Sequence, residues 1–425
     1  MLKKKKLATL YRDNPDACIS CSICLTACPV VKATQKYRGP KLNGPALTRL
    51  RKLTDDYDPM INFCSNCKNC DRVCPSGTPI SALNMKARAL HFKTNPHPLN
   101  DKLLSRNEEL GKLMSTTAVG AKLANIGMKV GCSLKLVKMM GLNPQAPFPQ
   151  YAGASFYKRF KEIKQNGPFK RQVLFYPGCY VNYNEPELGE LVVKILNYQG
   201  VEVLIDKRLK CCGSPLLSCG YLDKVEDHAK INTAILADYA KRGIDIVTTC
   251  TTCSLFLKQE YAELFDMEKE VEAYNQQLFE ICEYLLYLDE QGEFKHDGLG
   301  PVTQSYVHHT PCHLKVQGMG VPSMKLLSMI PALKVEQLTA PCCGLSGVYG
   351  YKEETAAISA NIGAELKQQI KEASATAGVC ECNLCRLQMQ NGTGKKAYHP
   401  LYLLDASYKA GHAPGYEVNT SKKAK

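Results

Sequence analysis

The stretch CISCSICLTACP at residues 18–29 decides the fold of the N-terminal part of this chain, and CSNCKNCDRVCP at residues 64–75 repeats its spacing. In each stretch, three cysteines are separated by two residues, and a fourth follows three residues later, directly before a proline. This is the spacing of bacterial iron-sulfur cluster ligands. The proline fixes the backbone direction and lacks an N–H group, so the chain turns away after the last ligand. The two stretches therefore predict a module with two [4Fe-4S] clusters.

In motifs of this kind the fourth cysteine usually binds the cluster of the other motif. We predict one cluster on Cys18, Cys21, Cys24 and Cys74, and a second on Cys64, Cys67, Cys70 and Cys28. Two zinc ribbons or a disulfide framework are the alternatives. Zinc sites, however, are built from CxxC pairs rather than from runs of three such cysteines.

A second cysteine plan occurs twice in the remainder of the chain. Its members are Cys179, Cys211, Cys212, Cys250 and Cys253 in the first copy, and Cys312, Cys342, Cys343, Cys382 and Cys385 in the second. The segments between them alternate in β-α-β-α-β order, which predicts parallel strands joined by helices. Loops at the carboxyl ends of such strands gather at one edge, so each copy should bring five thiols together. An internal duplication explains the repeated plan.

The metal of each copy is open at this point. Side chains of adjacent cysteines diverge, so a set of five that includes a Cys-Cys pair suits an iron-sulfur cluster of unusual shape, or a site with one bridging or free thiol. Structural zinc on four of the five thiols is the alternative. Gly213 and Gly344 are expected to let the backbone approach the metal. The other cysteines, Cys132, Cys219, Cys282 and Cys380, are expected to act as small buried apolar residues.

Composition limits the remaining possibilities. The chain has 425 residues and a net charge of +14, which suits an anionic partner surface. No signal peptide or apolar run long enough to span a membrane is visible. Residues 110–161 contain no acidic residue, and apolar positions between Val119 and Val137 fall on one helical face. This basic amphipathic helix is predicted to dock on a membrane or partner through Lys122, Lys129, Lys135 and Lys138, or else to cover a domain core.

The combined motifs resemble a known family. The phrases that carry the resemblance are PGCYVNYN at 177–184, CCGSPL at 211–216, HTPCH at 309–313 and CCGLSGVYGYK at 342–352. They are similar to proteins with two [4Fe-4S] motifs and two CCG domains: iron-sulfur subunits of glycolate and lactate oxidases, heterodisulfide reductase subunits and, most similar, the iron-sulfur subunit of anaerobic glycerol-3-phosphate dehydrogenase. The resemblance implies noncubane [4Fe-4S] clusters in one or both CCG domains, with zinc possible in one of them.

The resemblance also implies a role. It predicts an electron-transfer subunit that takes electrons from a flavoprotein partner and passes them to membrane quinone, peripherally bound at the cytoplasmic face of the inner membrane. No flavin, nicotinamide or substrate site is visible in the chain. The alternatives are an iron-sulfur subunit of a glycolate or lactate oxidase and a catalytic subunit like that of heterodisulfide reductases. A nucleic-acid partner is not expected.

The expected fold class is α+β with several domains. A helical, ferredoxin-like module at 1–100 is followed by a basic helical linker at 101–165 and by two duplicated βαβαβ domains, CCG domain 1 at 166–298 and CCG domain 2 at 299–412.

Overall fold

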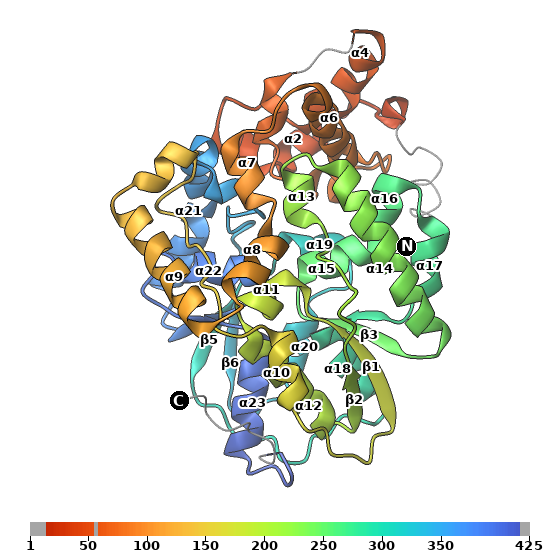
Figure 1. Ribbon diagram of the computed structural model, residues 1–425, viewed down its shortest axis with the longest axis vertical. Coiled ribbons are helices and arrows are strands. Elements are labelled where there is room, and N and C mark those ends of the chain that lie inside the picture. The colour runs from red at the N-terminus through yellow and green to blue at the C-terminus, as the bar shows by residue number, and fades with distance from the viewer. Residues whose placement is uncertain (1–13, 55–57, 417–425) are drawn as a thin grey trace.

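The N-terminal module is helical, as predicted. The computed structural model describes residues 14–54 and 58–416. In Figure 1 the module caps one end of the molecule. Its helices are η1 (Pro15–Ala17), α2 (Ile23–Ala27), α3 (Pro29–Ala33), η2 (Leu42–Ala46), α4 (Leu47–Thr54), η3 (Pro59–Phe63), α5 (Asn69–Val73) and α6 (Ile80–Thr94). The short helices α2 and α5 follow equivalent cysteines of the two motifs and pack against each other.

The linker contains α7 (Leu99–Leu104), α8 (Asn107–Met114), α9 (Ala118–Ser133), η4 (Leu136–Met140), α10 (Phe156–Arg159) and η5 (Phe160–Glu162). The predicted amphipathic helix is thus shorter than expected. It ends at Ser133, and Lys135 adopts a left-handed conformation with φ of 58°. This break turns Val137 inward, where it is buried, whereas the helical pattern predicts it on the exposed apolar face.

CCG domain 1 contains a parallel sheet of four strands in the order β2-β1-β3-β4. The strands are β1 (Arg171–Tyr176), β2 (Val201–Leu204), β3 (Asp245–Thr248) and β4 (Leu278–Glu280). The helices are α11 (Gly178–Tyr183), α12 (Pro186–Tyr198), α13 (Ser214–Ser218), α14 (Leu222–Lys241), α15 (Thr251–Leu255), η6 (Phe256–Glu260), α16 (Tyr261–Phe265), α17 (Glu268–Asn275) and α18 (Ile281–Glu290).

CCG domain 2 repeats this topology as β6-β5-β7-β8. Its strands are β5 (Ser305–His308), β6 (Lys334–Gln337), β7 (Ala377–Val379) and β8 (Ala397–Tyr398), and its helices are α19 (Cys312–Gln317), α20 (Pro322–Leu327), η7 (Tyr349–Tyr351), η8 (Glu353–Thr355), α21 (Ala356–Glu372), α22 (Asn383–Gln390) and α23 (Pro400–Ala410). The duplicated α/β fold is confirmed. The fourth strands β4 and β8 were not predicted, because two or three residues show no periodicity.

The two CCG domains share one hydrophobic core. Val173 and Phe175 of β1 belong to the same buried cluster as Tyr306 of β5 and Val379 of β7. The N-terminal module is joined to this body by a buried charge, because Lys68, 1% exposed, forms ion pairs with Glu260 and Glu263 of CCG domain 1. The carboxyl edges of both sheets are therefore fixed relative to the two N-terminal cysteine motifs.

A second buried ion pair holds the linker on CCG domain 2. Lys352 Nζ lies 2.5 Å from Asp101 Oδ1, and the two side chains are 10% and 3% exposed. Replacing Lys352 by Met leaves the Asp101 carboxylate buried without a cation, so we expect a loss of about 3 kcal/mol in the free energy of unfolding. The double change Lys352→Met with Asp101→Leu should recover most of that loss.

Chemical denaturation of the anaerobic protein measures both effects. Lys230→Met is the matched control, because Lys230 and Glu226 form an exposed pair whose removal should change the unfolding free energy by less than about 1 kcal/mol. Equal stability of the Lys352→Met and Lys230→Met proteins would contradict the proposed role of the buried pair.

Candidate metal centres

The two N-terminal motifs adopt the same backbone conformation around their cysteines. Ser20 and Ser22 of the first motif have φ of 58° and 65°, and Asn66 and Lys68 of the second have φ of 52° and 57°. Left-handed residues are rare outside glycine, so their recurrence at equivalent positions is a feature of the motif. Alternating conformations of this kind turn successive backbone N–H groups toward one point and create a site for an anion. Both loops are therefore shaped to surround a negatively charged group.

The structure brings the cysteines together across the two motifs. The pKa of Cys24 is raised by burial and by the charges of Cys18, Cys21 and Cys74. Cys74 therefore lies with the first motif, although its own motif begins at residue 64.

The converse holds for Cys28. The pKa of the Cys70 thiol is raised by burial, by Asp71 and then by Cys67, Cys64 and Cys28. Thus Cys28 lies with the second motif. This arrangement is the exchange that the spacing predicts, and the assignment of each thiol as a ligand stays a prediction.

Each CCG copy forms a connected series of thiols, most of which are buried. In copy 1, Cys179 interacts with Cys211, Cys211 with Cys212, Cys212 with Cys253, and Cys253 with Cys250. The series in copy 2 is the same: Cys312 with Cys342, Cys342 with Cys343, Cys343 with Cys385 at 3.3 Å between sulfurs, and Cys385 with Cys382. Copy 2 has a sixth member, because the buried Cys380 also contacts Cys385.

The two thiols of each adjacent pair differ in pKa: that of the first cysteine is lowered and that of the second is raised. Hydrogen bonds from Cys179 and Cys212, which outweigh burial, hold the pKa of Cys211 well below its usual value. Cys342 has a lowered pKa for the same reason, through Cys312 and Cys343, and it also accepts a hydrogen bond of 3.3 Å from the Gly344 amide. Thiolates are the form that binds metal. Both copies thus favour the thiolate form at the same position.

These all-sulfur donor sets, which are largely buried, fit iron-sulfur groups, which are held by cysteine thiolates. In the part of the chain that the structure describes, no group of three or more Cys, His, Asp or Glu side chains is arranged to hold one metal ion. The metal of each CCG site stays a prediction. The role expected of Gly213 and Gly344 needs correction: an added Cβ would meet Val225 of α14 or the backbone of Ser359 in α21, so these glycines permit close helix packing.

The thiols of the two CCG copies have different neighbours in the structure. Cys67 of the second N-terminal motif is close enough to Cys342 and Cys312 for the charges to raise pKa values on both sides. His313 joins the two regions. Its Nε2 lies 3.1 Å from the Asn66 carbonyl, which can only accept, so Nε2 donates and Nδ1 accepts from the Thr252 hydroxyl at 2.9 Å. Copy 2 therefore faces the N-terminal module inside the protein.

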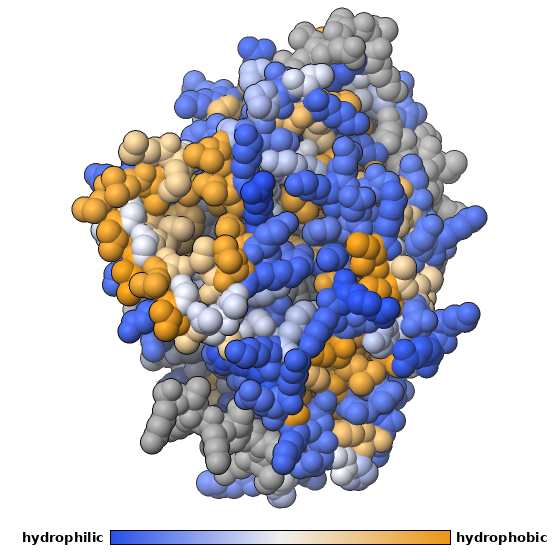
Figure 2. All heavy atoms as spheres, in the orientation of Figure 1, coloured by the Kyte–Doolittle hydropathy of each residue, from blue (hydrophilic) through white to orange (hydrophobic). Residues whose placement is uncertain are grey.

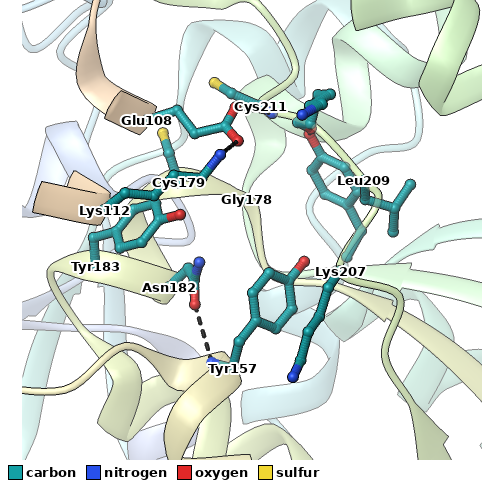
Figure 3. A pocket seen from close by; sticks show the side chains of 12 residues that line it. Glu108, Lys112, Tyr157, Gly178, Cys179, Asn182, Tyr183, Lys207, Leu209 and Cys211 are labelled. Carbon is teal, nitrogen blue, oxygen red and sulfur yellow. Dashed lines mark hydrogen bonds and ion pairs between the residues drawn. The ribbon is translucent and has the colours of Figure 1, made fainter. Parts of the chain in front are cut away.

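Copy 1 faces an open cavity instead (Figure 3). Its volume is about 210 Å³, and it is lined by Glu108, Lys112, Tyr157, Tyr176, Gly178, Cys179, Asn182, Tyr183, Lys207, Leu209, Lys210 and Cys211. Helix α8 supplies one wall, where the Glu108 carboxylate accepts a hydrogen bond of 3.0 Å from the Cys211 amide. Two of the five thiols of copy 1, those of Cys179 and Cys211, thus line a cavity that opens outward.

His309, which the sequence suggests is an ordinary polar histidine at the end of a strand, lies beside the thiols of copy 2. His309 is fully buried, and neither of its ring nitrogens has a hydrogen-bond partner among the described residues. It lies near Cys342, and burial lowers its pKa to about 4. The equivalent residue in copy 1 is Tyr176, whose hydroxyl donates to the Lys210 carbonyl at 2.6 Å. Aligning the two copies would have revealed this difference.

The four predicted docking lysines are all exposed: Lys122 and Lys129 lie on α9, Lys135 lies between α9 and η4, and Lys138 lies on η4. They accompany a continuous apolar surface, which Figure 2 shows as orange atoms over α9. We call it the apolar face; its members are Leu113 (66% exposed), Val119 (69%), Leu123 (65%), Ile126 (49%), Val130 (48%), Leu134 (65%), Leu136 (52%) and Met139 (86%). Lys138 also forms an exposed ion pair with Glu353.

Comparison with protein families agrees with this architecture. The 4Fe-4S dicluster domain matches residues 14–78, and the cysteine-rich CCG domain matches residues 173–258 and 306–390. These matches support the binding of iron-sulfur clusters by both kinds of domain.

Several curated proteins match most of the chain. A subunit of the anaerobic glycerol-3-phosphate dehydrogenase of Escherichia coli is 33% identical over 91% of this chain and 97% of its own length. A subunit of the fumarate reductase (CoM/CoB) of Methanothermobacter marburgensis is 26% identical over 94% of this chain and 74% of its own length. A probable glycolate oxidase iron-sulfur subunit of Bacillus subtilis is 23% identical over 82% of this chain and 84% of its own length.

The exchange of the fourth cysteines can be tested by mutation. Cys74 lies with the first motif, so Cys74→Ser should damage the cluster on Cys18, Cys21 and Cys24 and leave the second cluster intact. Cys28→Ser is the matched partner and should have the opposite effect. Iron analysis and EPR of the anaerobic proteins should show two different residual [4Fe-4S] signals. If Cys74→Ser instead removed the signal that depends on Cys64, Cys67 and Cys70, the exchange would be refuted.

Proposed function

The chain belongs to the family of the anaerobic glycerol-3-phosphate dehydrogenase iron-sulfur subunits, and from that premise we propose that it is the electron-transfer subunit of such a complex. In this proposal a flavoprotein partner oxidises glycerol 3-phosphate, and this chain carries the electrons toward quinone at the membrane. Iron-sulfur groups supply one-electron redox chemistry when bound. The residues of this chain supply their ligands, their burial and the surfaces that meet the partners.

The observation that carries the proposal is that four groups of cysteines, those of the two N-terminal motifs and of the two CCG copies, form one series through the molecule. Cys24 and Cys28 link the two N-terminal groups, whose sulfurs interact electrostatically. Cys67 then faces Cys342 of CCG copy 2. The half-buried Tyr180 lies between Cys382 of copy 2 and Cys250 of copy 1. A continuous series of redox sites with two ends is the arrangement required of a protein that transfers electrons from one partner to another.

The two ends of the series have different surroundings. At the first end, Cys21 is exposed and is flanked by the exposed apolar side chains of Ile19 (66%) and Ile23 (45%). Exposed apolar groups around a redox site suit a protein partner. The other end is the cavity beside Cys179 and Cys211. We therefore assign the flavoprotein to the Cys21 end.

A reconstitution experiment tests this function. Glycerol 3-phosphate should bleach the visible absorption of the oxidised clusters only when the flavoprotein of the complex is added. Ile19→Ser with Ile23→Ser should slow the bleaching, whereas Leu90→Ser, an exposed apolar residue of α6, should not. Bleaching by glycolate or lactate with their own dehydrogenases, but not by glycerol 3-phosphate, would assign the chain to a glycolate or lactate oxidase complex.

Reduction of a disulfide by the chain with an artificial electron donor, in the absence of any flavoprotein, would instead favour a catalytic reductase.

We also propose that the apolar face docks on an anionic membrane surface. Among the described residues, no helix is long and apolar enough to cross a membrane. Eight large apolar side chains are nevertheless exposed between Leu113 and Met139, in a stretch that has lysines and no acidic residue. A helix of this composition lies in the plane of the interface, with its apolar side chains inserted and its lysines near the lipid head groups.

Charge removal tests the docking. Lysines near an anionic surface contribute about 1 kcal/mol each, so changing Lys122, Lys129, Lys135 and Lys138 to Gln should greatly weaken sedimentation with vesicles of anionic lipid. High salt should weaken binding of the wild type, because this attraction decays within about a Debye length. The matched control changes the exposed Lys230, Lys241, Lys325 and Lys409 to Gln, which alters net charge equally. Equal binding by both variants would contradict docking through this face.

A further inference from the structure

The cavity beside CCG copy 1 has features of a binding site for an organic ligand. Aromatic rings of Tyr157, Tyr176 and Tyr183 line it together with Leu209. The hydroxyls of Tyr157 and Tyr176 already donate to the carbonyls of Asp206 and Lys210. Of the three rings that of Tyr157 is the most open to the cavity, since Tyr176 is 1% and Tyr183 6% exposed. A planar, largely apolar ligand gains most from such walls.

Cationic donors complete the cavity. Lys207 and Lys210 line it, and neither ammonium group has an acidic partner among the residues that the structure describes. Lys112 differs, since its Nζ lies 2.8 Å from Glu108 Oε1. The Glu108 carboxylate also lines the cavity, and its pairing with Lys112 leaves Lys207 and Lys210 as the cations open to a ligand. A planar ligand with carbonyl oxygens can lie against the aromatic walls and accept hydrogen bonds from these two lysines.

The cavity is also connected to the apolar face. Helix α8 contributes Glu108 and Lys112 to the cavity wall, and the next residue, Leu113, is the first member of the apolar face. Figure 1 shows α8 between α9, which carries that face, and α11, which carries Cys179. A lipid-soluble ligand could thus pass from the membrane surface to the thiols along one helix. The second cavity, beside Cys28 and Cys67, has only about 20 Å³ and admits no comparable ligand.

We propose that this cavity binds the head group of a quinone, with its ring against the tyrosines and a carbonyl oxygen accepting from Lys207 or Lys210. The inference rests on the proposed function and adds the location of its acceptor site. CCG copy 1 is then the last site of the electron series, and copy 2 connects it to the N-terminal module. Reduction of the quinone to the quinol takes two electrons, which come from glycerol 3-phosphate through the flavoprotein, and two protons, which come from the solvent that the open cavity admits. In this proposal the two CCG copies have different roles: copy 2 receives electrons from the N-terminal module, and copy 1 passes them to the quinone.

Binding of a quinone analogue tests the site without measuring turnover. Heptyl-hydroxyquinoline N-oxide is fluorescent, and quenching of its emission by the anaerobic, cluster-loaded chain gives a Kd. Lys207→Gln with Lys210→Gln should raise this Kd about tenfold, since hydrogen bonds from charged donors are the stronger ones. Tyr157→Leu should raise it several-fold by removing a ring. The visible cluster spectrum of each variant should match that of the wild type.

Lys230→Gln with Lys241→Gln is the control, because both residues are exposed on α14 and neither lines the cavity. No quenching by the wild type, or unchanged Kd values for both cavity variants, would overturn the inference. Displacement of the analogue by inorganic phosphate would also overturn it, by showing an anion site. None of these outcomes affects the reduction of the clusters by glycerol 3-phosphate and the flavoprotein, so the proposed function is tested separately.

Discussion

The structure depends on the burial of negative charge on sulfur. Metal-binding thiols must be deprotonated, and burial in an apolar protein opposes this by raising their pKa values, as it does for Cys28 and Cys67. Hydrogen bonds from backbone and side-chain donors lower the pKa values again and so stabilise the deprotonated thiols. In the N-terminal motifs the donors include the backbone amides of Val30 and Val31 for Cys28 and that of Asn69 for Cys67. Ser76 and Thr78 lower the pKa of Cys74 despite its burial. In the CCG copies the donors come from neighbouring thiols and from the amide after each Cys-Cys pair.

Duplication placed the same arrangement of five cysteines in two different surroundings within the protein. Both copies keep the series of thiols and the lowered pKa at the first cysteine of the pair. They differ three residues before the lone cysteine, where Tyr176 is bonded to the backbone and His309 has no partner among the described residues. They also differ in their neighbours, since copy 2 packs on the second N-terminal motif through His313. The repeated ligands give the two sites similar chemistry, and the surrounding residues give them different access.

The sequence predicted what depends on local spacing. Cysteine intervals are visible along the chain, and the duplicated strand and helix order follows from periodicity, so the fold class and the grouping of thiols could be inferred. Contacts between distant segments have no such signal. The tautomer of His313 depends on Asn66 and Thr252, and the cavity depends on α8 lying over α11, which only tertiary packing determines. The helix break at Lys135 was missed because left-handed lysine has no sequence signature.

The position of the linker explains how the ends of the thiol series stay apart. Its helices leave the N-terminal module, are fixed on CCG domain 2 by the Asp101–Lys352 pair, and then cover the copy 1 site with α8. The same segment continues into the apolar face. A membrane that receives this face would therefore lie beside the cavity, while Cys21 remains at the far end of the series, in the module that caps the molecule (Figure 1). A flavoprotein and a lipid surface could then be engaged at once, because neither needs the residues that the other covers.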